Sequence, residues 1–405
     1  MNRIIRSAEA NTFSMKRLFV IAFSLLLVIE FFAQSPEIVV PFRVGNKWGY
    51  SDTLGKIKIP AKYDTVPLFD YSTVYKGNHV IAIVKFNKKS MAINEKGTVV
   101  VPPKYDFINV IQQSAEIAFT VSSNRKFGVF TKGKELFPPI YDYMDITPYG
   151  HFKVHKGQKW GLISNDGKIV IPINYDDLRE KNASQPDIVN WEAIIWGKDR
   201  EFITVKTNLQ FDRPALTLPL EVEEISGYVS PEDINKEADK ARMEYELDSL
   251  RVDNYTGVVF KGKQQGIFLP AEAKKVYLFS KPYTIHGIRY FSSYERNYLK
   301  KHSAAYLIAV FNGKYGMINE KEEIVLPFEY DHIEEKEGFF LLKRNGKVGF
   351  FIWNTHYPVI QPIFDEYVRK YDIPVNDKWS FILFKIFKNG KPGFVGENGI
   401  RYFKD

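Results

Sequence analysis

A short phrase recurs along this chain and constrains its fold more than any other feature. Lys47-Trp48-Gly49 is followed by a turn glycine at Gly55, by Pro60 and by Tyr63-Asp64, and the same order begins again at Lys159-Trp160-Gly161. Self-similarity of this kind is typical of arrays in which one small structural unit is repeated. We therefore expect repeated units rather than one large globular core.

The copies align when they are counted back from an aspartate. A proline lies four residues before Asp64, Asp106, Asp176 and Asp331, and a glycine, or Met91, lies fifteen residues before them. A fifth copy has a one-residue deletion in a turn, and three looser copies follow at Gly266, Gly349 and Gly393, which gives about eight units. The motif residues of the clearer copies are Trp48, Gly49, Asp64, Gly128, Asp142, Trp160, Gly161, Asp176, Gly316 and Asp331.

Each unit has the signature of a β-hairpin. In the fourth copy, Asn165-Asp166-Gly167 is a turn signal between two runs of apolar, mostly β-branched residues. The following proline lacks an N–H group, so we expect the strands to end their pairing at Ile59, Val101, Ile171 and Leu326. A single hairpin buries too little to be stable alone, and neighbouring units must cover it. The predicted fold is an all-β tandem array of hairpin repeats, open and solenoid-like or, as the alternative, closed into a propeller.

The aromatic and acidic positions of the motif each allow two interpretations. The aromatic residue before the glycine is expected to pack between neighbouring units, although exposed rings could also form platforms for sugars. Its replacement by Ser90, Val348 and Pro392 in other copies favours packing. The aspartate after each tyrosine is expected to accept hydrogen bonds from turn N–H groups. A row of calcium ligands is the alternative, but one acid per unit falls short of the six to eight oxygens that Ca²⁺ takes.

The motif resembles that of the WG-containing repeat family. The resemblance rests on Lys-Trp-Gly, a turn with Asp or Asn and Gly, Ile-Pro and Tyr-Asp, over about residues 38–178 and more loosely over 255–402. It implies a β-rich repeat protein, often exported, in which the repeat itself has no assigned catalytic residues. The resemblance therefore carries over no catalytic, metal-binding or cofactor-binding position.

The N-terminal residues 1–33 are predicted to be a Sec-type signal peptide. Met15-Lys16-Arg17 precedes an uncharged run from Leu18 to Ile29, and Glu30 makes this run too short for a membrane span. Residues 1–14 have the character of an over-extended start. The chain has no cysteine, so stability must come from buried area rather than from disulfides. Without residues 1–33, 52 basic and 46 acidic residues remain, a net charge of +6 that does not indicate nucleic-acid binding.

The repeats are predicted to lie in two blocks, residues 34–185 with repeats 1–4 and residues 255–405 with repeats 5–8. Residues 186–254 form an insertion in which Trp196-Gly197 suggests a decayed repeat. A charged helix is expected near residues 230–250, with Ser230 as N-cap and Pro231 in the first turn. Two apolar stripes are predicted on this helix, and we expect it to pack on the edge of the array, with a docking role as the alternative. The stripes are Ile234, Ala238, Ala241 and Tyr245 on one side and Met243, Leu247 and Leu250 on the other.

A second insertion, roughly residues 280–303, is rich in aromatic and basic side chains. Ser292 and Glu295 form a capping-box pattern, and tyrosines recur every four residues, which predicts a short helix with a tyrosine stripe. Packing is the expected role of this segment. If the protein has a site for a charged ligand, the candidate patch is Arg289, Tyr290, Tyr294 and Tyr298.

The sequence offers no catalytic signature. His151 and His155 lie in a strand-like stretch, where four residues separate them by roughly 13 Å, too far for one metal ion. We therefore expect no enzyme, no cofactor and no metal, and instead a periplasmic or secreted binding or scaffolding protein. Its partner would be a protein or glycan of the cell envelope and not a nucleic acid, and no transmembrane span would remain after signal removal. The alternative is an envelope hydrolase that uses acids of the inserted segments.

Overall fold

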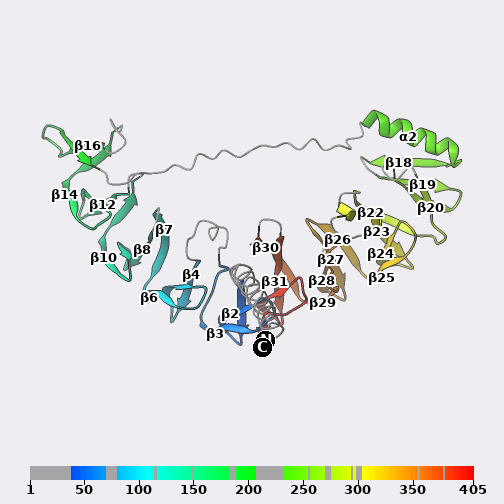
Figure 1. The fold of residues 1–405 in the computed structure, drawn as a ribbon, viewed down its shortest axis with the longest axis horizontal. Coiled ribbons are helices and arrows are strands. Elements are labelled where there is room, and N and C mark those ends of the chain that lie inside the picture. The colour runs from blue at the N-terminus through cyan, green and yellow to red at the C-terminus, as the bar shows by residue number, and fades with distance from the viewer. Residues whose placement is uncertain are drawn as a thin grey trace, which may run out of the picture. The chain divides into compact units, whose positions relative to one another are not determined.

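The fold is described from a computed structural model (Figure 1). The structure describes residues 38–69, 80–113, 116–147, 150–181, 188–206, 231–253, 256–269, 275–292, 295–297, 303–353, 356–376 and 379–405. The predicted signal peptide lies outside these residues. Within them, small β-sheets follow one another along the chain, and none closes into a barrel. The prediction of an all-β repeat array is confirmed.

The described residues fall into two compact units, and the first takes those that lie within Met1–Pro214, Asp372–Phe381 and Tyr402–Asp405. Its strands are β1 (Val39–Val44), β2 (Lys47–Asp52) and β3 (Ile57–Tyr63) with β33 (Phe403–Lys404); β4 (Ile81–Phe86), β5 (Lys89–Asn94) and β6 (Val99–Tyr105); β7 (Phe107–Gln113), β8 (Glu116–Ser123), β9 (Lys126–Thr131) and β10 (Lys134–Tyr141); β11 (Tyr143–Ile146), β12 (Phe152–Lys156), β13 (Lys159–Ile163) and β14 (Ile169–Tyr175); and β15 (Asp177–Glu180), β16 (Ile188–Ile194) and β17 (Glu201–Lys206). Each group forms one sheet.

The second unit comprises Ala215–Tyr371 and Ile382–Arg401. Its elements are α2 (Pro231–Glu244); β18 (Ser249–Asp253), β19 (Thr256–Lys261), β20 (Gln264–Leu269) and β21 (Lys275–Leu278); β22 (Thr284–Tyr290), β23 (Ala305–Phe311), β24 (Lys314–Asn319) and β25 (Ile324–Tyr330); β26 (His332–Lys336), β27 (Phe339–Arg344), β28 (Lys347–Phe351) and β29 (Ile360–Phe364); and β30 (Glu366–Asn376), β31 (Trp379–Lys388) and β32 (Lys391–Gly396). Within the β30–β31 hairpin, the segment Asp372–Phe381 is counted with the first unit.

The core lies between neighbouring sheets rather than inside any one of them. Phe152 and Val154 of β12 pack against Val129 and Phe137 of the preceding sheet in one buried cluster. In the second unit, the Phe350 ring stacks on a ring of the next sheet, Phe384, with centroids 4.1 Å apart. Each sheet therefore covers the apolar face of its neighbour, as expected for hairpins too small to be stable alone.

The helix α2 packs on the sheet that follows it in the chain. Ala238 and Ala241 share a buried cluster with Val259 and Phe268 of β19 and β20. The predicted second stripe is wrong, because the helix ends at Glu244 and Leu247, just beyond it, turns into the same cluster. Ser230, the predicted N-cap, lies outside the described residues.

The last strand of the chain lies on the first sheet. β33 pairs in parallel with β1, and the main-chain N–H of Arg43 donates to the carbonyl of Tyr402 over 3.1 Å. The buried Arg43 side chain forms an ion pair with Asp405 over 2.9 Å. The C-terminal residues thus cover an edge of β1 that would otherwise present unpaired backbone groups.

A further sheet, β15–β16–β17, follows the fourth repeat, with β15 before the predicted insertion of residues 186–254 and with β16 and β17 inside it. Its Trp196-Gly197 pair does not occupy the strand position of the other Trp-Gly pairs. It forms the turn between β16 and β17, where Gly197 has a φ of +83° and the Trp196 side chain is 68% exposed. This segment therefore forms strands as a repeat would, but without the aromatic position of the motif.

Candidate functional site: the junctions between repeats

The proline of the motif lies in a β-bulge and does not end its strand. In the first sheet, Trp48 of β2 pairs with Tyr63 of β3, and Tyr50 pairs with Ile59, so β3 has extra residues between its two pairing positions. Pro60 falls in this bulge, where its missing N–H costs no ladder bond. The prediction that pairing ends at Ile59, Val101, Ile171 and Leu326 is therefore wrong, because each strand pairs again at the following tyrosine.

The glycine of the motif faces this bulge. A Cβ atom on Gly49 would lie 2.3 Å from the carbonyl oxygen of Ile59, and one on Gly349 would lie 2.3 Å from that of Ile360. Gly128 is confined in the same way by the backbone opposite, Gly161 by both the backbone and a side chain, and Gly316 chiefly by the Phe328 ring. The glycine is thus required for close approach of the backbones and not for a positive φ.

The tyrosine and the aspartate that follow the bulge lie in different environments. Tyr63 and Tyr105 are buried, whereas the aspartate after each of them leaves the sheet toward the next one. The Tyr105 hydroxyl donates to Glu135 of the next sheet over 2.6 Å, and that of Tyr175 donates to Glu201 over 2.7 Å. Burial first, and then the carboxylate acceptor, raise the pKa of Tyr175 to about 12.

Each of these aspartates joins two consecutive repeats. Lys47, the first residue of the Lys-Trp-Gly phrase, donates to Oδ1 of Asp64 in its own repeat over 2.6 Å. The other oxygen of Asp64 accepts the main-chain N–H of Lys88, which lies in the first turn of the next repeat, over 2.9 Å. The main-chain N–H of Asp64 donates to the carbonyl of Lys85 in that repeat. We call this arrangement a junction.

The junction recurs at six aspartates in the described part of the chain. The lysine and aspartate pairs are Lys47–Asp64, Lys89–Asp106, Lys126–Asp142, Lys159–Asp176, Lys314–Asp331 and Lys347–Asp365. The second oxygens accept the main-chain N–H groups of Lys88, Asn124, Gly157, Trp196, Asn345 and Gly390. The turn N–H groups that the sequence predicted as partners of these aspartates thus belong to the following repeat.

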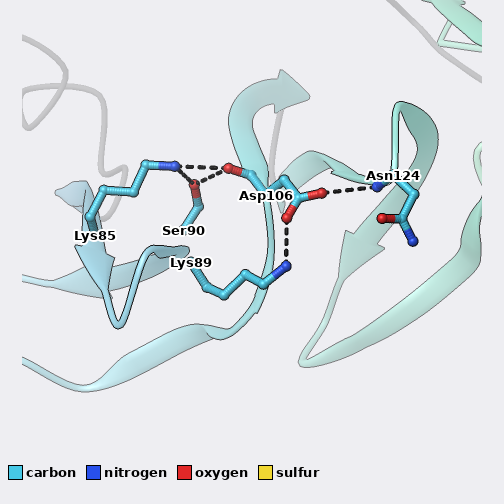
Figure 2. A network of polar contacts seen from close by, with 5 residues as sticks. All are labelled: Lys85, Lys89, Ser90, Asp106 and Asn124. Carbon is cyan, nitrogen blue, oxygen red and sulfur yellow. Dashed lines mark hydrogen bonds and ion pairs between the residues drawn. The ribbon is translucent and has the colours of Figure 1, made fainter.

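The junction at Asp106 shows how the motif tolerates loss of its aromatic residue (Figure 2). The Lys89 ammonium and the Asn124 N–H hold the two carboxylate oxygens, over 2.5 Å and 2.9 Å. Ser90, which stands where other repeats have Trp, donates to the main-chain oxygen of Asp106, and Lys85 donates to the same oxygen and to the Ser90 hydroxyl. Polar contacts therefore replace the ring at this junction.

The junction contacts stabilise the charged form of the aspartates. The hydrogen bond from Lys47, followed by that from the Lys88 N–H, holds the pKa of Asp64 below its usual value. The same two kinds of donor, with the lysine first, lower the pKa of Asp106 and of the other junction acids, Asp142, Asp176, Asp331 and Asp365. These carboxylates are therefore ionised and already engaged by two donors at neutral pH.

The aromatic residue of the motif is half-buried in its sheet. Trp160 packs against the cluster that joins the β13–β14 and β15–β16 strands. Its ring also contacts His155, with centroids 4.7 Å apart, and lies 4.5 Å from the Lys153 ammonium. Trp48 is half-buried as well. For Trp160, packing between units is the arrangement observed.

The two neighbouring histidines do not form a site together. His155 lies within β12, and His151 is buried just before this strand. Among the residues that the structure describes, no three His, Cys, Asp or Glu side chains come together as a metal site. Nor is any helix in the described ranges long and apolar enough to cross a membrane.

The candidate ligand patch is divided by the fold. Tyr290 ends strand β22 and packs against a buried cluster, so the predicted helical stripe does not include it. The capping box is present, because the Ser292 N–H donates to Glu295 and the Glu295 N–H donates to the Ser292 hydroxyl. Arg289 is tied to Glu295 over 2.9 Å and lies 4.4 Å from the Trp353 ring. Tyr294 and Tyr298 lie outside the described residues.

Sequence reasoning missed the lysine of the junction. A lysine stands directly before the aromatic position in Lys47, Lys89, Lys126, Lys159, Lys314 and Lys347. Its recurrence about 17 residues before the aspartate was a visible signal. Opposite charges at a fixed offset in successive repeats would have predicted this ion pair.

Comparison with solved structures gives distant likenesses only. A crystal structure of the eukaryotic initiation factor is 8% identical, with 90% of this chain and 95% of that chain covered, at a TM-score of 0.27. Hsv2 from Kluyveromyces lactis is 9% identical over 67% and 89% of the two chains at 0.19, and an inactive variant of virginiamycin B lyase from Staphylococcus aureus is 13% identical over 90% and 94% at 0.17. Scores this low carry no argument about function.

The sequence of the repeat matches a known protein family. No curated protein matches the sequence. The WG containing repeat family matches residues 48–89, 91–114, 131–160, 160–180 and 315–347, which include five of the six junction aspartates. These residues carry the bulge, the close-approach glycine and the lysine–aspartate junction described above. The chain therefore contains repeats of the WG-containing repeat family over these residues.

Proposed function

We propose that this protein is an exported, non-enzymatic array that binds or scaffolds a protein or glycan of the cell envelope. The observation that carries the proposal is the use of the repeated motif. Its lysine and aspartate form an ion pair at six junctions, where the aspartate also accepts a main-chain N–H of the next sheet. The motif thus connects successive sheets, and the exposed turns and edges of those sheets are available for contact with a partner.

Export is supported by the sequence before the first sheet. A basic stretch at Lys16-Arg17, an uncharged apolar run and a small residue at Ala33 are the parts of a secretory signal. The absence of cysteine fits an array whose stability comes from packing between sheets in any redox environment. The protein would then act in the periplasm or outside the cell.

Export can be tested with a C-terminally tagged full-length chain in its native host. Cell fractionation followed by intact mass measurement should place the protein outside the cytoplasm, shortened by about 33 residues. A variant with Lys16 and Arg17 both changed to Glu should remain uncleaved in the cytoplasm. An uncleaved wild-type protein in the cytoplasm would contradict the proposal.

Binding can be tested by capture from an envelope extract on the immobilised mature protein. The expected result is saturable retention of one component, which is lost when the extract is treated either with protease or with periodate. The first treatment identifies a protein partner, and the second identifies a glycan. Retention that does not saturate, or that persists when the immobilised protein has been unfolded, would contradict a binding role.

A further inference from the structure

The first turns of the repeats share a one-sided charge pattern. These turns span residues 44–47, 85–89, 122–126, 155–159, 260–264, 310–314, 343–347 and 387–391. They contain 16 lysines and arginines and no acid. The junction accounts for one lysine in six of these turns. Among the other basic residues, Lys85 donates to the Asp106 carbonyl, Lys388 donates to the Ile363 carbonyl and Arg344 is paired with Glu329.

The surplus charges are best defined in the first unit. Lys88, Arg125 and Lys156 are exposed, and none of them forms an ion pair with any residue in the described ranges. Each lies in the same turn as a lysine that is already paired with a junction aspartate, namely Lys89, Lys126 or Lys159. The second, third and fourth turns of this edge therefore keep a positive charge after the junction acids are counted, whereas Lys47, the one basic residue of the first turn, is matched by Asp64.

The turns form one continuous edge because the junctions connect them. Asp64 contacts the first turn through Lys47 and the second through the Lys88 N–H. Asp106 joins the second turn to the third in the same way, and Asp142 joins the third to the fourth. We call this series of four turns the junction edge. Sheets that pack face to face lie about 10 Å apart, so the turns along this edge succeed one another at about that distance.

The opposite ends of the same sheets differ in charge. Three of the second turns, residues 52–56, 94–98 and 164–168, carry an acid beside a lysine, whereas residues 131–134 carry two lysines and no acid. Asp52, for example, accepts the main-chain N–H of Leu54 and that of Lys56 within its own turn. Consecutive turns of a hairpin meander point to opposite ends of the sheet, so the four turns of the junction edge, which contain no acid, lie opposite these second turns. The turn between β16 and β17, which follows the junction edge, carries Lys198, Asp199 and Arg200.

We propose that the junction edge of the first unit binds an anionic polysaccharide, which lies along the four turns. A single exposed ion pair contributes little, so a small anion would be held weakly. A polymer with regularly spaced carboxylates can engage several turns at once, and each further contact is then intramolecular. The inference deepens the proposed function, on which it rests, by naming the class of envelope component.

The test measures binding of the mature protein to polygalacturonate, with neutral dextran of similar length as the control polymer. We expect binding to polygalacturonate that weakens as salt is added and no binding to dextran. In a junction-edge variant, Lys88→Gln, Arg125→Gln and Lys156→Gln, affinity should fall roughly tenfold or more because three contacts are lost together.

A matched variant removes the same number of charges from the second turns. Lys56, Lys96 and Lys134 are exposed and lie in the second turns of the first three sheets. Changing all three to Gln should alter the affinity by no more than roughly twofold. Both variants should retain the thermal unfolding transition of the wild type, since neither removes a junction contact.

Three results would overturn the inference. The first is no binding of the wild type to polygalacturonate, the second is equal weakening in both variants, and the third is tighter binding to polyglutamate, which would indicate an acidic protein instead. The proposed function fails separately, because it requires saturable capture of any envelope component. Capture without polygalacturonate binding would therefore reject only this inference.

Discussion

Arg43 and Asp405 form an ion pair over 2.9 Å although 362 positions separate them in the sequence. The pair holds the C-terminal residues against β1, where the guanidinium is buried and the carboxylate is partly exposed. Tyr402, directly before β33, is fully buried, and its hydroxyl donates a hydrogen bond to the carbonyl of Thr53. The end of the chain is therefore part of the first unit and not a free tail.

We expect Tyr402→Ala to destabilise the first unit by about 3 kcal/mol, because a buried aromatic ring is lost. Tyr402→Phe, which removes only the hydrogen bond, should cost about 1 kcal/mol. Hydrogen exchange at the main-chain N–H groups of Arg43 and Gly45, which donate to Tyr402 and Lys404, should become faster in the alanine variant. Unchanged exchange there would show that β33 does not hold this edge.

Gly128→Ala should destabilise the third sheet by about 1 to 3 kcal/mol through overpacking. The added Cβ would lie 2.6 Å from the carbonyl carbon of Pro138, and both atoms belong to paired strands that cannot separate freely. Gly133 in the same sheet has open space and a φ of +74°, so Gly133→Asn should change stability by less than about 0.5 kcal/mol. Denaturant unfolding of the two variants measures the contrast.

The junctions predict loss of stability in acid. The folded-state pKa of Asp106 and of the other junction acids is lowered, chiefly by their lysine partners. The ionised carboxylates therefore contribute stability that is fully present above the unfolded-state pKa of about 3.9 and is lost as the pH falls through the lower folded-state value. Thermal unfolding followed from neutral to acidic pH should show this decrease.

Asp106→Asn provides the control for the acid effect. The variant should have a lower melting temperature than the wild type at neutral pH, and the difference between the two should narrow as the pH falls below about 4. A constant difference across the titration would mean that the charge of Asp106 does not contribute. Asn124→Gly is the matched variant, because it removes a side chain that is not the donor and keeps the main-chain N–H group that is.

We expect the folded protein to lose stability at alkaline pH when the Tyr175 hydroxyl ionises. Its pKa is raised to about 12, so the neutral phenol contributes stability that is present below the unfolded-state pKa of about 10 and lost as the pH rises through about 12. Tyr175→Phe should cost about 1.5 kcal/mol at neutral pH, because Glu201 loses its donor. Ultraviolet titration of phenolate formation should show one fewer late-titrating tyrosine in this variant, and an unchanged late phase would contradict the assignment.

The helix α2 offers two nearby positions with opposite surroundings. Ala241 is 2% exposed against β19 and β20, whereas Met243 is 76% exposed. Ala241→Asp should destabilise the second unit by at least about 2 kcal/mol, because an unpaired charge is buried, and Met243→Asp should be nearly neutral. Equal effects in denaturant unfolding would show that the helix does not use this face.

Local sequence signals predicted local structure well. The Ser292–Glu295 capping box, the start of α2 at Pro231 and the strands around Asn165-Asp166-Gly167 involve residues only a few positions apart. Interactions at this range depend on backbone propensity and on side chains that the sequence places together. The predicted tyrosine stripe was wrong at Tyr290 because tertiary pairing of β22 with β23 prevailed over a helical period.

The sequence by itself determined the repeat, its hairpins and its likeness to the WG-containing repeat family. Only the tertiary structure decided that Pro60 lies in a bulge, that Asp64 holds the turn of the following repeat and that Asp405 returns to Arg43. The reason is physical: a sequence motif specifies which groups can donate and accept hydrogen bonds. Which donor meets which acceptor depends on how neighbouring sheets pack, and that packing is a property of the whole array.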